Sequence, residues 1–338
     1  MSDLISNPCI IPYLVMINDS DRNSFFKNSL DKCAKDKVVL DMGSGTGIFS
    51  FYALKAGAKF VYAVEYNRKS AELTEKILSS SFDKSRFKVL NINFWTEDLS
   101  KYFKEPIDIL VTETLGHVLL DQGITDTWET IKPYISDDFI SIPDRVYVDL
   151  YQWNYELPHS NKWMKEHINN KPFIKENTLD SDFSEALLKI EKEFFYNTRK
   201  WINLEKDEIF NLNPDVIYEN VLDYNINSLP YHHKDNDSEN QKDFFDSLNC
   251  IQPPLHRIPS TEFSIKSKNL GEKTFGLVFK MSFEDKFMYL QSMHWSFMPI
   301  FNCKQGKKIK FKFNKKEIIG QSNGGNFTNF CYWTMKTE

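Results

Sequence analysis

The sequence lacks the features that would bind a polyanion or cross-link a small fold. Its 42 Lys and Arg residues face 47 Asp and Glu residues, a formal net charge of -5, and this balance disfavours nucleic acid as a partner. The five cysteines are odd in number and scattered, with no C-x-x-C pair. Neither a disulfide framework nor a zinc ribbon is therefore indicated, and we expect reduced thiols in a cytoplasmic protein.

No apolar run is long enough to span a bilayer, so no membrane partner is expected. The nearest candidate, residues 9–17, is interrupted by Pro12 and followed by Asn18 and Asp19, and we expect it to be packed structure. The chain also has no internal repeat. Its 41% of hydrophobic residues can fill real cores, and its 338 residues make two domains the reasonable expectation.

Strand-like and helix-like segments alternate from Lys37 onwards. The apolar run 38–40 ends in a glycine-rich turn, which is typical of a buried parallel strand, and residues 48–56 follow with helical spacing. The same alternation predicts three more strands, at 60–64, 87–90 and 108–112, and one more helix, at 69–80. This pattern predicts a doubly wound, Rossmann-like α/β domain, which we assign to residues 1–143 together with a short N-terminal helical segment.

The pattern changes near Asp144. Residues 146–155 alternate apolar and polar side chains, as a half-buried antiparallel strand does. Residues 274–279 and 309–313 are rich in β-branched and aromatic side chains, which also favour strands. We therefore assign residues 144–338 to a second, β-rich domain.

The turn after the first predicted strand carries the sharpest local pattern. Its glycines follow the spacing Gly-x-Gly-x-Gly, tighter than the Gly-x-Gly-x-x-Gly of dinucleotide-binding folds, and an aspartate precedes them. Glycines let the backbone approach a ligand closely, and the tighter spacing favours a cofactor with an amino-acid tail and no phosphate. The residues expected to bind that cofactor are Asp41, Gly43, Ser44, Gly45, Gly47 and Ile48.

Two further positions follow the next predicted strands. Glu65 ends the second strand, where a carboxylate can accept hydrogen bonds from both hydroxyls of a ribose, although by itself it could be an ordinary surface glutamate. Asn93, Phe94 and Trp95 follow the third strand, where an aromatic side chain could pack on an adenine base. Thr96 and Glu97 are alternatives for a contact with the exocyclic amine.

Four motifs, in this order, resemble the protein arginine methyltransferase family. Residues 16–22 resemble the family's helix before the first strand, and residues 41–49 with 55–58 resemble its cofactor loop. Residues 111–117 resemble the start of its double-glutamate hairpin, and residues 293–295 resemble its Thr-His-Trp loop. The resemblance implies a class I methyltransferase that uses S-adenosylmethionine. It also implies a Rossmann-like methyltransferase domain followed by a β-barrel-like domain.

The resemblance assigns roles to single residues. Arg22 would pair with the carboxylate of the cofactor, Glu113 would lie beside the cofactor and grip a guanidinium, and His294 would reach the active site from the barrel. Taken one at a time, Arg22 could be a solvated helix residue, Glu113 a cap for the next turn and His294 part of a core. Their joint occurrence in family order favours the functional interpretation.

The resemblance also implies an insertion in the barrel-like domain. The segment at about 156–250 is longer than a plain barrel needs, and residues 184–197 within it have helical spacing. In the family an inserted helical arm builds a dimer, so a homodimer is one expectation. The apolar stripe of this helix could equally belong to an intramolecular core or cover the acceptor pocket.

One position departs from the family pattern. The second glutamate of the hairpin should lie nine residues after Glu113, where this sequence has Gln122, which can hydrogen-bond but cannot neutralise a charge. Asp121 could substitute only if the hairpin shifts by one residue. His117 in the same loop could contribute a proton acceptor.

Several functions therefore stay open. The leading one is an N-methyltransferase acting on a guanidino or other basic nitrogen of a protein, a peptide or a small molecule. The alternative is a small-molecule methyltransferase without arginine specificity, which Gln122 favours. The intact glycine loop disfavours a catalytically silent scaffold protein, and its spacing disfavours a nicotinamide oxidoreductase. His232, His233 and His256 do not follow a metal-ligand spacing, so no metal is expected.

Overall fold

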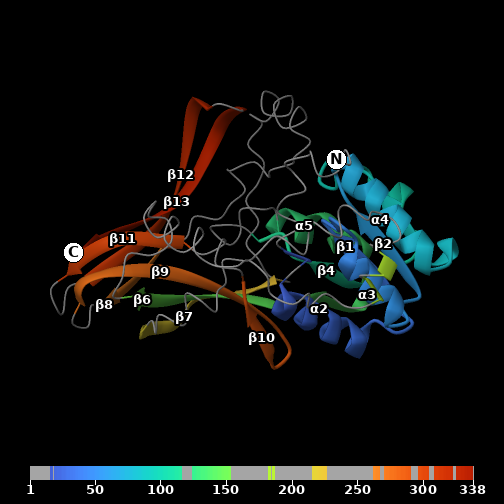
Figure 1. Cartoon of the computed structure of the whole chain (residues 1–338), viewed down its shortest axis with the longest axis horizontal. Helices are drawn as coiled ribbons and strands as arrows, with labels where there is room; N and C mark the ends of the chain where they lie inside the picture. Colours follow the sequence, from blue (N-terminus) through green and yellow to red (C-terminus); the bar gives the residue numbers. More distant parts are fainter. Residues whose placement is uncertain are drawn as a thin grey trace.

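The structure is a computed structural model that describes the chain in segments. They are residues 16–17, 19–115, 124–153, 182–183, 185–186, 215–226, 262–266, 270–290, 296–303, 308–322 and 325–337. Figure 1 shows helices around a sheet in the N-terminal part and antiparallel strands in the C-terminal part. No helix within the described segments is long and apolar enough to cross a membrane.

The N-terminal part is built on a five-stranded sheet in which neighbouring strands run parallel, in the order β3-β2-β1-β4-β5. The strands are β1 (Val38–Met42), β2 (Phe60–Val64), β3 (Phe87–Leu90), β4 (Ile107–Thr112) and β5 (Ile135–Ile142). All five residues of β1 are buried, as its apolar sequence predicts for a central strand. The strand order reverses between β1 and β4, and sheets of this kind bind ligands at the carboxyl ends of the strands beside such a point.

The described helices of this part connect and cover the sheet. They are α2 (Ser20–Cys33), α3 (Ile48–Lys55), α4 (Arg68–Ser81) and α5 (Ile124–Ile131), with short 3₁₀ helices η1 (Lys84–Arg86), η2 (Leu99–Lys101) and η3 (Lys132–Tyr134). The Asp19 side chain caps the start of α2 by accepting a hydrogen bond from the Arg22 backbone N–H. Gly47 occupies the N-cap of α3 and has no side chain that could accept a hydrogen bond. The free backbone N–H groups in the first turn of α3 therefore need an acceptor from another residue.

The C-terminal part consists of antiparallel strands in two sheets. The first has the order β10-β9-β6-β7 and consists of β6 (Arg145–Trp153), β7 (Asp215–Asn225), β9 (Leu270–Phe283) and β10 (Lys286–Tyr289), with β11 (Ser296–Cys303) also paired to β9. The second has the order β13-β12-β8 and consists of β8 (Glu262–Lys266), β12 (Lys308–Ser322) and β13 (Gly325–Thr337).

The sequence places an insertion at about 156–250, most of which lies outside the described residues. Within this range the structure describes β7, which pairs with β6, so residues 215–225 belong to the first antiparallel sheet. Of the helix expected at 184–197, residues 185–186 are helical and the others lie outside the described residues. His232, His233 and His256 also lie outside the described residues.

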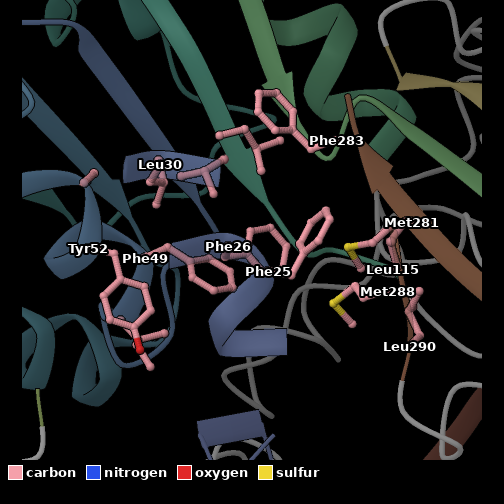
Figure 2. Close-up of a cluster of buried hydrophobic side chains, with 14 of the residues drawn as sticks. Phe25, Phe26, Leu30, Phe49, Tyr52, Leu115, Met281, Phe283, Met288 and Leu290 are labelled. Atoms are coloured by element: carbon pink, nitrogen blue, oxygen red, sulfur yellow. The ribbon is translucent and has the colours of Figure 1, made fainter. Parts of the chain in front are cut away.

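One apolar cluster joins the two parts of the chain. Figure 2 shows Phe25 and Phe26 of α2 near Leu115, which follows β4, and near Met281 and Met288 of the β9–β10 hairpin. All five side chains are buried, and burial of a large apolar side chain contributes about 1.5–3 kcal/mol. The cluster therefore fixes α2 and the end of β4 against the hairpin.

Candidate cofactor and acceptor site

The loop between β1 and α3 depends on its glycines. Gly43, Gly45 and Gly47 have φ values of 74°, 58° and 78°, in the left-handed region that side chains other than hydrogen disfavour. The backbone N–H groups of Gly43 and Ser44 both donate to the carbonyl oxygen of Val64, at 3.0 and 2.9 Å. The loop is thereby folded over the end of β2, at the edge of the sheet where a ligand is expected.

Asp41, the residue before this loop, supplies the missing cap of α3. Its Oδ2 atom accepts hydrogen bonds from the Ser50 backbone N–H at 2.9 Å and from the Ser50 hydroxyl at 2.6 Å. Its Oδ1 atom is buried and has no hydrogen-bond partner. Burial raises the pKa of Asp41 from 3.8 to about 7, although the bonds from Ser50 oppose this shift. The first residue of α3, Ile48, is buried and packs in the apolar cluster.

This shift gives a first prediction, on the ligand-free protein. The pKa of Asp41 is 3.8 in the unfolded chain and about 7 in the folded protein. Between these pH values the Asp41 carboxyl is protonated in the folded protein and ionised in the unfolded chain. The unfolding free energy should therefore fall as the pH rises, by about 2 kcal/mol between about pH 5 and pH 7. Asp41→Asn should lose this dependence, and urea unfolding at both pH values measures it. Parallel pH profiles for the two proteins would contradict the assignment.

Glu65 ties the glycine loop to the start of α4. Its Oε2 atom accepts a hydrogen bond from the Gly45 backbone N–H at 2.8 Å, and its Oε1 atom accepts one from the Asn67 backbone N–H at 2.7 Å. The residue is only 6% exposed, so it is not an ordinary surface glutamate. A carboxylate has about four lone-pair directions, so these bonds leave room for further donors such as ribose hydroxyls.

Arg22 and Glu113 form a buried ion pair between α2 and the end of β4. The Arg22 Nε and Nη2 atoms each lie 3.1 Å from Glu113 Oε2, and the two side chains are 9% and 3% exposed. The guanidinium also lies over the Phe49 ring, 4.6 Å from its centroid. Glu113 Oε1 is buried without a hydrogen-bond partner. Burial raises the pKa of Glu113, and the charge of Arg22 opposes that shift.

The two aromatic residues in the loop after β3, Phe94 and Trp95, differ in how deeply they are buried. Asn93 accepts a hydrogen bond from the Trp95 backbone N–H at 3.2 Å, which stabilises the turn. Phe94 is 3% exposed and packs in a second apolar cluster with residues of β1 and β2. Trp95 is half-buried, so it is the more accessible ring of this loop. Thr96 and Glu97 are exposed.

The structure brings together most of the candidate residues that it describes. Asp41 lies within electrostatic range of both Glu65 and Arg22, and Arg22 contacts Glu113. Gly43 lies against the end of β4, because a Cβ atom placed there would be 3.1 Å from Thr114 Cγ2. The candidates Gln122, Asp121, His117 and His294 lie outside the described residues, so their roles stay predictions.

Sequence reasoning missed two residues that shape this site. Thr74 of α4 lies under the glycine loop, where its hydroxyl donates to the Gly45 carbonyl at 3.1 Å, and Phe49 provides the ring beneath Arg22. Thr74 lies outside the four motifs, and Phe49 ends the cofactor-loop motif 41–49, in which no such role was assigned to it. Asp19 adds a buried carboxylate next to Arg22. Among the described residues, no group of three or more His, Cys, Asp or Glu side chains is arranged to hold a metal ion.

The chain matches known methyltransferases in sequence over its N-terminal part. Residues 28–134 match the family described as ribosomal protein L11 methyltransferase (PrmA). Protein arginine N-methyltransferase 9 of Xenopus laevis is 33% identical over 117 residues, which is 34% of this chain and 14% of that protein. The match therefore spans a small share of the length of this relative.

The fold matches solved structures along almost the whole chain. Protein arginine methyltransferase 10 of Arabidopsis thaliana has a TM-score of 0.56 at 14% identity, covering 96% of this chain and 97% of that one. The Trypanosoma brucei PRMT1 enzyme–prozyme heterotetrameric complex with AdoHcy has a TM-score of 0.54 at 15% identity, covering 96% and 98%. These matches confirm the predicted fold, a Rossmann-like part followed by a β-barrel-like part. With the sequence matches, they confirm the resemblance to the protein arginine methyltransferases.

Proposed function

We propose that the protein is an S-adenosylmethionine-dependent N-methyltransferase that acts on a guanidino or other basic nitrogen. The observation that carries this proposal is that buried carboxyl groups outnumber buried basic groups around Arg22 and the glycine loop. Asp19, Asp41, Glu65 and Glu113 are all buried there, and Arg22 is the one buried cation among the described residues of the site. Such a site favours a ligand with net positive charge, and a sulfonium donor together with a basic acceptor supplies it.

The residues present fit this cofactor. Ser44 Oγ and Asp41 Oδ1 are buried polar atoms without partners at the glycine loop, and a bound ligand would satisfy atoms of this kind. Arg22 would bind the carboxylate of the amino-acid tail, and Glu65 would accept hydrogen bonds from the ribose. The loop glycines would allow the cofactor to lie against the backbone. When bound, the cofactor supplies an activated methyl group on its sulfonium.

The protein then has to align a nitrogen with that methyl group. Glu113 is suited to this task because its side chain is buried beside Arg22 at the end of β4, and the next residue, Thr114, lies against Gly43 of the glycine loop. A buried carboxylate holds a cationic nitrogen in place and stabilises the proton that leaves it, so positioning and electrostatics supply most of the catalysis. Trp95, or the buried Phe94, would pack on the adenine.

The nature of the acceptor separates the leading function from its alternative. The relatives named above are protein arginine methyltransferases, which supports arginine as acceptor, although the sequence match covers only 14% of the first of them. Gln122 instead of a second glutamate supports the alternative, a small-molecule methyltransferase without arginine specificity. A neutral amide offsets less of the repulsion between a guanidinium and a sulfonium than a carboxylate does.

We also propose a cytoplasmic location and a homodimer. Scattered cysteines support the location, and Cys33 is a free, half-buried thiol in the described structure. One structural neighbour is a heterotetrameric complex, which supports assembly of some kind. The net charge of -5 supports the absence of a nucleic-acid partner. Light scattering on the purified protein measures the oligomeric state directly.

A parallel screen tests the function. The purified protein should transfer a labelled methyl group from S-adenosylmethionine to at least one of three acceptor classes: arginine peptides, free arginine or simple amines. Mass spectrometry then locates the methyl group. If arginine is a poor acceptor because charge is missing, Gln122→Glu should raise arginine turnover by about tenfold, the effect of a well-placed charged hydrogen bond. Transfer to none of the three classes would contradict the proposal.

A further inference from the structure

The guanidinium of Arg22 rests on two aromatic rings. Its central carbon lies 4.6 Å from the centroid of the Phe49 ring and 5.7 Å from that of the Phe26 ring. These two rings lie 4.0 Å apart, and Phe26 packs edge to face with Phe25 of the same helix, with centroids 5.2 Å apart. Because an arginine side chain has many rotamers, the rings that it packs against decide where its charge lies. The position of Arg22 therefore depends on these phenylalanines.

Two methionines of the C-terminal part pack in the same apolar cluster. Met281 of β9 and Met288 of β10 lie directly opposite each other in the hairpin, so their side chains share one face of it. Both are buried, and Figure 2 shows them near Phe25 and Phe26. Helix α2 also contacts β10. The β9–β10 hairpin therefore supports the phenylalanine rings that in turn support Arg22.

The same methionines lie beside the end of β4. Leu115 is fully buried in this cluster, two residues after Glu113, and Figure 2 shows it near Met281 and Met288. The hairpin thus packs against both elements of the cofactor site that meet in the Arg22–Glu113 ion pair, helix α2 and the end of β4. Its side chains set how these two elements lie relative to each other.

The hairpin is fixed at its turn. Asp144, between β5 and β6, accepts hydrogen bonds from the Ser282 hydroxyl at 2.8 Å and from the Glu284 backbone N–H at 3.1 Å. Glu284 also pairs with Lys32 in the last turn of α2, at 2.8 Å, but both side chains are exposed. Exposed ion pairs contribute little to stability. The buried methionines are therefore the contact that holds α2 in place.

We propose that Met281 and Met288 are positioning residues for the amino-acid tail of the cofactor. They act through Phe25 and Phe26, which place Arg22, and the C-terminal part of the chain thereby sets the affinity for the tail. This inference rests on the proposed function, which assigns the tail carboxylate to Arg22. It adds a role for the β9–β10 hairpin, which belongs to the other part of the chain.

The experiment compares S-adenosylhomocysteine with 5′-methylthioadenosine by calorimetry. Both contain adenosine and a neutral sulfur, but only the first has the amino-acid tail. A misplacement of about 1 Å can cost about 100-fold, and partial relaxation around a new cavity gives a smaller shift. Met288→Ala should therefore bind S-adenosylhomocysteine about tenfold more weakly than the parent protein does and methylthioadenosine equally well. Met288→Leu, which keeps most of the volume, should bind both ligands as the parent does.

Two controls separate positioning from a loss of stability. Phe311→Leu makes a cavity at a fully buried position of β12, in the second antiparallel sheet, so it should lower stability and change neither affinity. Phe287→Ala removes the ring next to Met288 in β10, which is 60% exposed. It should also change neither affinity, because it leaves the buried face of the hairpin intact.

A double variant shows whether the effect passes through Arg22. In an Arg22→Gln background the tail has lost its partner, so adding Met288→Ala should no longer weaken S-adenosylhomocysteine binding. Met288→Val makes a smaller cavity and should give a smaller loss of the same kind if Met288→Ala does not fold. Parent-like affinity for S-adenosylhomocysteine in the folded variant, or an equal loss for both ligands, would overturn the inference and leave the proposed function intact. Failure of the parent protein to bind S-adenosylhomocysteine at all would overturn both.

Discussion

Replacing Gly47 with alanine should weaken the binding of S-adenosylmethionine about 100-fold. Gly47 has a φ of +78°, and a Cβ atom there would lie 2.7 Å from Thr74 Cγ2. Thr74 is fully buried and β-branched, so its side chain has little freedom to move away. The loop itself must shift, and it carries the Gly45 amide that holds Glu65. Displacing positioning groups by about 1 Å costs about 100-fold, which calorimetry can measure directly.

Gly57 provides a matched control for backbone strain. Its φ is +92°, but a Cβ atom there would make only an ordinary contact of 3.5 Å with Lys35 Cγ. Gly47→Ala and Gly57→Ala should each lose about 1–2 kcal/mol of stability from the left-handed backbone, and only the first should lose cofactor affinity. Adding Thr74→Ser to Gly47→Ala removes Cγ2 but keeps the hydroxyl, so part of the affinity should return. Cofactor affinity within twofold of the parent in Gly47→Ala would contradict the assignment of this loop.

Much of the parallel sheet could be predicted from the sequence because its central strands are buried. The apolar run 38–40 and the strands predicted at 60–64, 87–90 and 108–112 all fall within the observed strands. β5 was missed because its sequence is not an apolar run: Asp137 and Asp138 are exposed in an edge strand. An edge strand has one neighbour instead of two, so its sequence is less constrained.

The C-terminal part was harder to predict for the same physical reason. β7 is also an edge strand, and its polar sequence, which includes Asp223, gave no alternating pattern. Asp223 pairs with Arg145 of β6, at 2.8 Å, across a distance of 78 residues in the chain. Contacts of this kind become visible only once the strands are paired. The sequence therefore predicted segments of β6, β9 and β12 but missed β7, β8, β10, β11 and β13.

The candidate site could also be predicted only in part from the sequence. Motif spacing pointed to the glycine loop and Glu65, each of which follows a buried strand, and the family resemblance pointed to Glu113. The contact between Arg22 and Glu113 could not be predicted, since the two residues are 91 positions apart and meet only because α2 docks on the end of β4. Asp41 illustrates a third case: its motif position was recognised, but its role in capping α3 was not.

Glu113→Gln should lower the rate of methyl transfer at least about 100-fold under saturating cofactor and acceptor. Glutamine has nearly the same shape and still forms hydrogen bonds, so the change removes charge and little else. Loss of one well-placed electrostatic group in a water-excluded site typically costs about 100–1,000-fold in turnover. Steady-state kinetics with the acceptor found by the methyl-transfer screen measures this effect, and Glu72→Gln on exposed α4 is the control.

The same variant distinguishes charge from binding. If Glu113 aims the acceptor, Glu113→Gln loses turnover although its affinity for S-adenosylhomocysteine does not fall, a combination that general unfolding cannot produce. Glu113→Asp keeps the charge one methylene further from the acceptor, so its turnover should lie between those of the parent and Glu113→Gln if distance matters as well as charge. Parent-like turnover in Glu113→Gln would mean that the acceptor nitrogen arrives uncharged and needs no carboxylate. In that case the buried negative charge beside the glycine loop would serve the sulfonium alone, and the acceptor would be a neutral nitrogen compound.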